Sequence, residues 1–456
     1  MGNRDKRVPA RSQRLAVAKL TPPDWFGWLG VAAMFLLPAV RFRHGGGVWY
    51  FPLLSLGEWL LLPLGVLSLT MGFLSLSRVR ERTLLPLWIS AIVPAALWLL
   101  AAGTSMLSNG VGPGGGDIFL SWAVHLIFPT LTFLPLLTMR VWRDRLMRAL
   151  AAGLVVNAVF VFWQVRSAGV APPDTELLRF GGFLANQHDY GLMLGLGLPL
   201  IAAWRGGDHS SNKALANLFC TFLLPVLTLS ACFGWVGLAA SAVGLAVAWA
   251  AWRSYAWILG IFICLLVFGY GSEARESREL PQRRLFAESA MLGGGSYRRA
   301  FNTFQVRPYL GSGPESFCLG TGHEPADTLE PMPWYASLVG GTGLVGLGMW
   351  IVLLGELAAR TMGRFGRRCL WHGGVLGGVM ALAVAGLWTD ALPEGAGALV
   401  GFLIALSILE EPDPSHAQAA ARQRRAREPE APPPPQPPPP SSAGKPSGDT
   451  DVIVRK

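Results

Sequence analysis

Arginine residues gather in two segments that separate long apolar runs, and their chemistry points to an anionic ligand. One segment is the stretch 179–191, RFGGFLANQHDYG, which begins with Arg179. Arginine keeps its charge at any working pH, and its planar guanidinium pairs with phosphate through two parallel hydrogen bonds. The other segment, 271–334, holds five further arginines: Arg283, Arg284, Arg298, Arg299 and Arg307. We therefore predict that the two segments bind a phosphate-bearing ligand.

Candidate acids and bases occur in or next to the same two segments. The pair His323–Glu324 is a candidate general base, because imidazole changes protonation near neutral pH. The alternative for this pair is an ordinary surface contact in a loop. Asn186 is expected to hydrogen-bond backbone at a turn into an apolar run. The remaining candidates are Asp174, His188, Asp189, Glu315, Asp327 and Glu330.

Composition identifies the class of protein that must position these residues. Of the 456 residues, 52% are hydrophobic and only 14% are charged, whereas soluble domains carry about a quarter charged residues. The 18 tryptophans favour the two interfaces of a bilayer. The net charge of +10 comes from short basic clusters between apolar runs, so no nucleic-acid partner is expected. The five cysteines form no CxxC pair, so we expect neither a metal site nor a disulfide framework.

The apolar runs predict an all-α polytopic membrane protein, because each is long enough to cross a bilayer as a helix. The basic clusters follow even-numbered spans, which places both termini in the cytoplasm. We expect a cytoplasmic segment 1–24, a membrane domain 25–410 with a large outward loop 271–334 between spans nine and ten, and a disordered proline-rich cytoplasmic tail 411–456. About twelve spans are predicted, at 25–40, 51–73, 84–106, 118–139, 146–165, 190–204, 214–231, 235–252, 256–270, 335–357, 370–388 and 396–409.

Glycines inside the predicted spans are expected to let helices approach one another closely, as small residues do in lipid. None of them follows a predicted strand, which excludes a nucleotide-binding glycine loop. The clearest examples are Gly191, Gly195, Gly343, Gly346 and Gly348.

Four motifs in order resemble the O-antigen ligase and polysaccharide polymerase superfamily of bacterial inner-membrane proteins. RFGGFLANQHDYGLMLGLGLPL is similar to that family's Arg-x-x-Gly…Asn-x-x-x-x-Gly…Pro start of a span, and RPYLGSGPESF to its Pro-x-x-Gly-x-Gly-x-x-x-Phe segment. WYASLVGGTGLVGLGMWIVLL resembles its Leu-x-x-x-Glu-x-Gly-x-x-Gly helix start, and LTLSACFGWVGLAAS its Thr-x-Ser-Arg-Gly-x-x-x-Gly span. The resemblance covers residues from about 146 to 410.

The resemblance implies a metal- and cofactor-independent glycosyltransferase of the inner membrane whose active face is periplasmic. Such an enzyme takes a glycan from undecaprenyl diphosphate and passes it to lipid A core, a second lipid-linked repeat or a protein. Membrane lipids and other polysaccharide-assembly proteins are its expected neighbours. By this resemblance two arginines bind the diphosphate at the catalytic site: Arg179 matches the first position, and Arg298 or Arg299 is our choice for the second. His323, which lies near the position of the family's base in the sequence, is the candidate substitute for it. Arg284, Arg307, Asn186 and Glu315 are the expected substrate contacts.

The chain departs from the family's pattern at the positions linked to acceptor activation. Counting back from Gly343, the family's histidine falls at Met332 and its asparagine at Pro333. Its glutamate falls at Gly341, and the arginine of Ser-Arg-Gly at Ala231. Several alternatives stay open: a substitute base such as His323, a polymerase-type member, a non-catalytic member, or a transporter or flippase with twelve spans.

Overall fold

The computed structural model describes most of the membrane domain. The described residues are 22–39, 41–44, 47–50, 54–78, 84–110, 115–167, 182–184, 187–205, 235–250, 297–313, 333–365, 370–387, 389–390, 392–393 and 395–409. The predicted spans 214–231 and 256–270 and the predicted tail 411–456 lie outside them.

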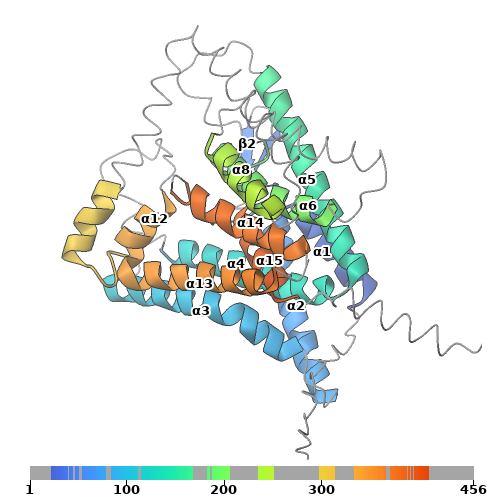
Figure 1. Ribbon diagram of the computed structural model, residues 1–456, viewed down its shortest axis with the longest axis horizontal. Helices are drawn as coiled ribbons and strands as arrows, with labels where there is room; N and C mark the ends of the chain where they lie inside the picture. Colours follow the sequence, from blue (N-terminus) through green and yellow to red (C-terminus); the bar gives the residue numbers. More distant parts are fainter. Residues whose placement is uncertain are drawn as a thin grey trace, which may run out of the picture. The chain divides into compact units, whose positions relative to one another are not determined.

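The described chain is almost entirely helical, which confirms the helical part of the predicted fold class (Figure 1). Every predicted span that falls on described residues coincides with a helix. One addition was not predicted: strands β1 (Arg41–His44) and β2 (Gly47–Tyr50) form a short antiparallel hairpin. The helices are α1 (Asp24–Phe35), α2 (Leu56–Arg78), α3 (Leu84–Asn109), α4 (Gly115–Leu137), α5 (Arg140–Ser167), α6 (Gln187–Arg205), α8 (Trp235–Ala250), α12 (Trp334–Ser337), the π-helical turn η2 (Leu338–Thr342), α13 (Gly343–Phe365), α14 (Leu370–Ala385) and α15 (Gly397–Ile408), with a further helix at 297–306.

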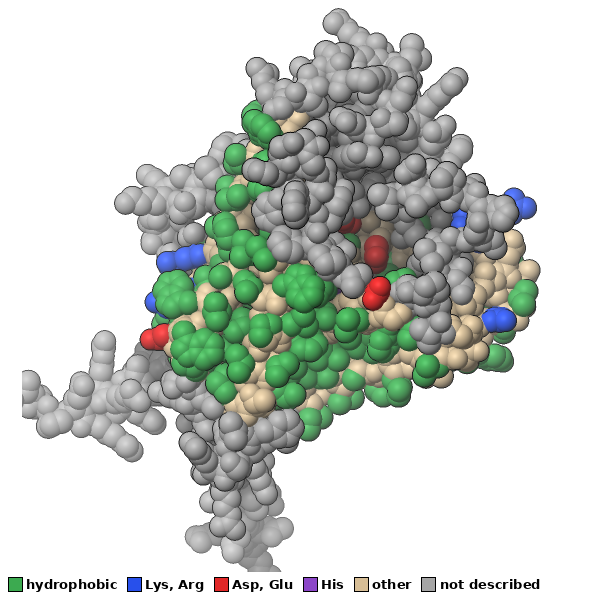
Figure 2. Space-filling view, turned by 180° about the vertical axis from the view of Figure 1, so that it is seen from behind, with side chains coloured by type: hydrophobic (Ala, Val, Ile, Leu, Met, Phe, Trp, Pro, Cys, Tyr) green, Lys and Arg blue, Asp and Glu red, His purple; other side chains and the backbone are tan. Residues whose placement is uncertain are grey.

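Within the described ranges, four helical segments are long and apolar enough to cross a membrane by length and composition: Trp88–Asn109, Gly116–Leu137, Arg140–Gln164 and Trp334–Met362. A helix satisfies its backbone N–H and C=O groups internally, which is what a segment in hydrocarbon requires. Several helices also expose large apolar side chains, among them Leu100 at 67% and Ile351 at 57%. Hydrophobic side chains cover much of the described surface in Figure 2, and charged ones are sparse. These features indicate a membrane protein.

Contacts between helix ends fall into two groups. At the beginning of α5, Arg143 lies over Trp371 at the beginning of α14, and Asp144 accepts a hydrogen bond from Trp204 at the end of α6. We call this the basic end, after Arg140, Arg143, Arg145 and Arg148 of α5. At the opposite end, the end of α5 contacts residue 182, the beginning of α2 contacts residue 395, and the end of α3 contacts residue 311. The beginning of α5 meets the end of α6, so these two helices run in opposite directions.

Four buried tryptophans form the aromatic centre that joins α3, α4, α12 and α13. Trp98 lies 5.2 Å from Trp122 and 5.3 Å from Trp350 between ring centroids, and Trp334 lies 5.4 Å from Trp122. Each is at most 5% exposed. The large apolar rings of this group fill the space between helices.

Glycines do bring helices close together, as predicted, but not at every predicted position. A Cβ placed on Gly237 of α8 would overlap the backbone of Gly191 in α6. A Cβ on Gly244 would lie 2.8 Å from the carbonyl oxygen of Gly377 in α14. Gly348 faces open space, so the expected close approach is wrong there. The first two contacts bring the predicted spans α6, α8 and α14 together.

Candidate functional site

Only part of the predicted site falls on described residues. Arg298, Arg299 and Arg307 are described, and all three are exposed. The other predicted site residues, Arg179, Asn186, Arg284, Glu315 and His323, lie outside the described residues.

The helix 297–306, hereafter the arginine helix, packs on the segment where α12, η2 and α13 join. Ala300 is 1% exposed and packs with Ala336 and Val339. The hydroxyl of Tyr297 donates a hydrogen bond to the carbonyl oxygen of Leu387, at 2.9 Å. The arginine helix is therefore fixed against the opposite end of the bundle by apolar packing and by one hydrogen bond to the segment after α14.

A cleft of about 580 Å³ lies between the arginine helix and α13. Among the described residues, Arg298 is the only charged one in its lining, and Arg299 does not line it. The two side chains diverge because consecutive helical residues point about 100° apart. The cleft is thus an apolar trough with one guanidinium at its side. Its apolar and aromatic lining comes from Tyr297, Ala300, Phe301, Phe304, Val339, Leu344 and Leu347.

The loop 307–313, which follows the arginine helix, docks on η2 through backbone hydrogen bonds. The N–H of Ser312 donates to the carbonyl oxygen of Gly340 at 2.9 Å, and that of Gly313 to Gly341 at 2.9 Å. In the other direction, the N–H of Leu344 donates to Pro308 at 2.9 Å. Two motifs that the sequence places about thirty residues apart, RPYLGSG and WYASLVGGTG, are therefore one structural unit.

Arg307 is tied to the end of α3. Its guanidinium donates a hydrogen bond to the side-chain oxygen of Asn109, whose amide nitrogen donates to the carbonyl oxygen of Gly311 at 3.2 Å. The hydroxyl of Ser105 donates to the carbonyl oxygen of Gly341 at 2.8 Å. The contact with Asn109 therefore fixes the direction of the Arg307 guanidinium.

Burial raises the pKa of Tyr297 above its ordinary value of 10.0, and the neighbouring Tyr335 raises it further. The folded protein favours the protonated phenol of Tyr297. The contribution of this phenol to the stability of the fold is therefore complete below its ordinary pKa and is lost as the pH rises through the raised pKa. We expect Tyr297 to ionise at higher pH than a free tyrosine. Absorbance titration of phenolate in the wild type and in Tyr297→Phe checks this, and a difference curve centred at or below pH 10 would contradict it.

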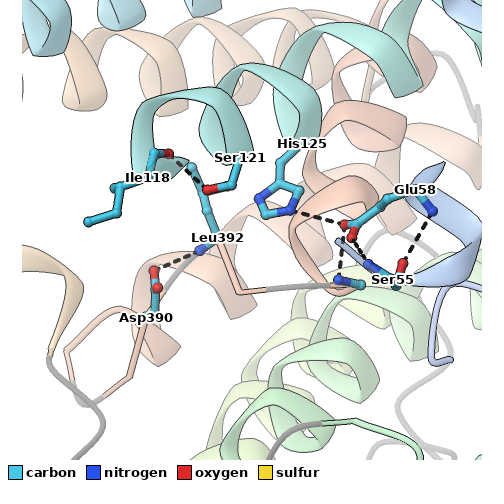
Figure 3. A network of polar contacts seen from close by, with 8 residues as sticks. Ser55, Glu58, Ile118, Ser121, His125, Asp390 and Leu392 are labelled. Carbon is cyan, nitrogen blue, oxygen red and sulfur yellow. Dashed lines mark hydrogen bonds and ion pairs between the residues drawn. The ribbon is translucent and has the colours of Figure 1, made fainter. Parts of the chain in front are cut away.

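A second polar site joins α2, α4 and the turn before α15 (Figure 3). Nε2 of His125 lies 3.1 Å from Oε1 of Glu58, and the two side chains are 1% and 0% exposed. The same oxygen accepts a hydrogen bond from the N–H of Gly395 at 2.9 Å, and Oε2 accepts one from the N–H of Ser55 at 2.7 Å. Asp390 accepts from the N–H of Leu392 at 3.0 Å in the same turn. Glu58 thus holds three elements together.

Sequence reasoning missed the Glu58–His125 pair, although the chain carried signals for it. Ser55 and Glu58 fit the S-x-x-E capping box, and the hydroxyl of Ser55 accepts a hydrogen bond from the N–H of Glu58 at 3.2 Å. His125 is an ionisable residue inside an apolar run, which marks a position that needs a partner. Gly397 lies against the imidazole, since a Cβ there would come within 2.6 Å of Nδ1.

The end of the RFGG motif is anchored to α5. The N–H of Phe183 donates to Oδ1 of Asn157 at 2.8 Å, and Gln164 exchanges two hydrogen bonds with the backbone of Gly182, at 3.0 and 3.2 Å. The ring of Phe183 stacks on Phe160 with centroids 4.1 Å apart. Gly182 and Phe183 are therefore held on α5.

No known protein family matches the chain, and no curated protein matches it significantly. The geometry of the described site is thus the basis for assigning a function.

Proposed function

We propose that this protein is a membrane glycosyltransferase of the O-antigen ligase and polymerase type. It moves a glycan from undecaprenyl diphosphate to an acceptor, which is a polysaccharide or lipid-linked glycan, lipid A core or a protein. The observation that carries the proposal is the apolar cleft beside Arg298. A polyprenyl diphosphate has a hydrocarbon chain and an anionic head, and the cleft offers an apolar wall and a guanidinium side by side.

The arginines supply the chemistry expected of such a site. In the transfer step the acceptor hydroxyl oxygen bonds to the anomeric carbon, and the bond from that carbon to the phosphate oxygen breaks. Undecaprenyl diphosphate leaves with the bonding electrons, and the hydroxyl proton passes to a base, for which His323 is our candidate. Arg298, with Arg179, stabilises the charge that develops on the leaving diphosphate. Because the diphosphate is a good leaving group, positioning supplies much of the remaining rate.

The proposal includes a topology of twelve spans with both termini in the cytoplasm. The basic end then faces the cytoplasm, as the positive-inside rule requires, and loop 271–334 is periplasmic. Support comes from the concentration of Arg140, Arg143, Arg145 and Arg148 at one end. The arginine helix is hydrogen-bonded to Leu387, which follows α14, and α14 begins at the basic end. This contact supports a periplasmic active face.

A transporter or flippase is the alternative that one observation favours. The buried Glu58–His125 pair is ionisable, and such pairs often mark transport pathways in membrane proteins. Glu58, however, caps the first turn of α2 instead of interrupting a helix near its middle, where transporters place their binding sites. Glycan profiling of a deletion strain distinguishes the two, because loss of a transporter leaves the substrate on the cytoplasmic side.

We expect Arg298→Ala to lower glycan transfer about 100-fold or more, as loss of a charge-stabilising donor does. Arg299→Ala should have a clearly smaller effect, because Arg299 does not line the cleft. The measurement is transfer in cells, read as glycan chain length and attachment, at matched protein level. Arg360→Ala, which removes an arginine paired with Glu356 on α13, is the control. Full transfer by Arg298→Ala would exclude Arg298 from the site.

A further inference from the structure

The first turns of α5 hold an arginine in an unusual setting at the basic end. The guanidinium carbon of Arg145 lies 4.6 Å from the ring centroid of Trp28 and 4.5 Å from that of Trp142. The two rings are themselves 5.8 Å apart and nearly perpendicular, at 89°. Arg145 therefore lies in the corner between two indoles, each within cation–π distance of its charge.

The position of Trp142 follows from a glycine in α1. Trp142 is 2% exposed, and its ring covers Gly27 so closely that any Cβ there would overlap the indole. Trp28, the neighbour of Gly27, is 55% exposed. One wall of the corner is thus fixed in the core and the other faces outward, so the corner is built by packing and opens to the surroundings.

The charge of Arg145 is not neutralised within the described part of the chain. Neither Arg145 nor the nearby Arg140 and Arg148 forms an ion pair there. The adjacent carboxylate, Asp144, accepts a hydrogen bond from Trp204 at 3.1 Å. Contacts to π faces leave the in-plane N–H donors of a guanidinium available, and these donors match the geometry of a phosphate.

The surroundings of the corner are those of a bilayer interface. Trp25, one helical turn before Trp28 in α1, is 51% exposed, and Val141, next to Trp142 in the sequence, is 58% exposed. Tryptophan prefers the headgroup level of the membrane, and apolar side chains next to it offer a surface for acyl chains. Clustered arginines at this level attract anionic lipids.

We propose that Arg145, held between Trp28 and Trp142, binds the phosphate of an anionic phospholipid in the leaflet that borders the basic end. The phosphate accepts hydrogen bonds from the free edge of the guanidinium, and the acyl chains lie along the apolar side chains of α1 and α5. This site is separate from the arginine helix and does not depend on the proposed glycan transfer.

Native mass spectrometry of the full-length protein, titrated with phosphatidylglycerol or phosphatidylcholine of equal chain length, tests the site. We expect the wild type to hold the first phosphatidylglycerol about tenfold more tightly than Arg145→Lys does, because lysine keeps the charge but lacks the planar fork. Trp28→Leu removes the exposed indole beside Arg145 and leaves Trp142 in place. This variant should also bind phosphatidylglycerol more weakly than the wild type. Arg360→Ala, at another position of the bundle, should bind like the wild type.

Three outcomes would overturn the proposal. Full binding by both Arg145→Lys and Trp28→Leu would show that net charge alone attracts the lipid. An equal loss in Arg360→Ala would show a non-specific effect. Displacement of phosphatidylglycerol by millimolar inorganic phosphate would identify a soluble phosphate as the ligand instead of the lipid.

Discussion

Replacing Glu58 with alanine is expected to destabilise the fold by about 3–5 kcal/mol, the range for breaking a buried ionic pair by removing one partner. The carboxylate accepts hydrogen bonds from the N–H groups of Ser55 and Gly395 and contacts His125. Its loss leaves the N–H groups of Ser55 and Gly395 without this acceptor where no water replaces it, and it removes the cap of α2. Thermal and denaturant unfolding of the purified protein in detergent measure the change.

Two variants separate this effect from a general loss of charge. Glu356→Ala breaks an exposed ion pair within α13 and should change stability by no more than about 0.5 kcal/mol. Glu58→Gln keeps one acceptor oxygen but turns an amide N–H₂ toward one of the backbone N–H groups. We therefore expect a loss of stability between those of Glu356→Ala and Glu58→Ala. Equal stability of Glu58→Ala and the wild type would mean that the pair does not hold α2, α4 and the 395 turn together.

Replacing Gly343 with alanine is expected to destabilise the protein by about 2–5 kcal/mol and to detach the arginine helix. Its φ of 66° and ψ of −161° lie in a region that only glycine occupies readily. A Cβ there would lie 2.5 Å from the carbonyl carbon of Tyr309 and 2.7 Å from the N–H nitrogen of Gly311. Backbone atoms cannot move aside as a side chain does, so the loop 307–313 must separate from η2.

Gly348→Ala is the matched control on the same helix, because a Cβ at Gly348 meets nothing within 4 Å. Alanine is favoured over glycine in a helix by about 1 kcal/mol, so this variant should be as stable as the wild type or more stable. Limited proteolysis of residues 297–313 reports detachment directly. If Gly343→Ala unfolds at the same temperature as Gly348→Ala and resists proteolysis to the same extent, the contact of Gly343 with Tyr309 and Gly311 does not hold the loop 307–313 on η2.

Much of the helical architecture was predictable because it depends on local composition. Apolar runs such as 84–106 and 118–139 became α3 and α4, since a long apolar segment can only bury its backbone polar groups by forming a helix. The hairpin 41–50 was missed because so short a stretch carries little periodicity. Boundaries also moved outward, as in α3, which ends at Asn109, where polar residues still complete the last turn.

The candidate site was predictable in residue type but not in arrangement. The sequence favoured arginines of loop 271–334 and offered no reason to separate Arg298 from Arg299. The fold separates them, because only Arg298 borders the cleft against α13. Similarly, Asn109 had no assigned role until the structure placed it against Arg307.

The sequence by itself determined that this chain is a helical membrane protein with its arginine-rich motifs between apolar spans. Hydrophobicity and charge act along the chain, so they can be read residue by residue. The tertiary structure alone decided that Glu58 meets His125, that Gly343 meets Tyr309, and that Arg145 sits between Trp28 and Trp142. Such pairs join positions far apart in the chain or on different helices. Their contact depends on how the helices pack, which no local pattern encodes.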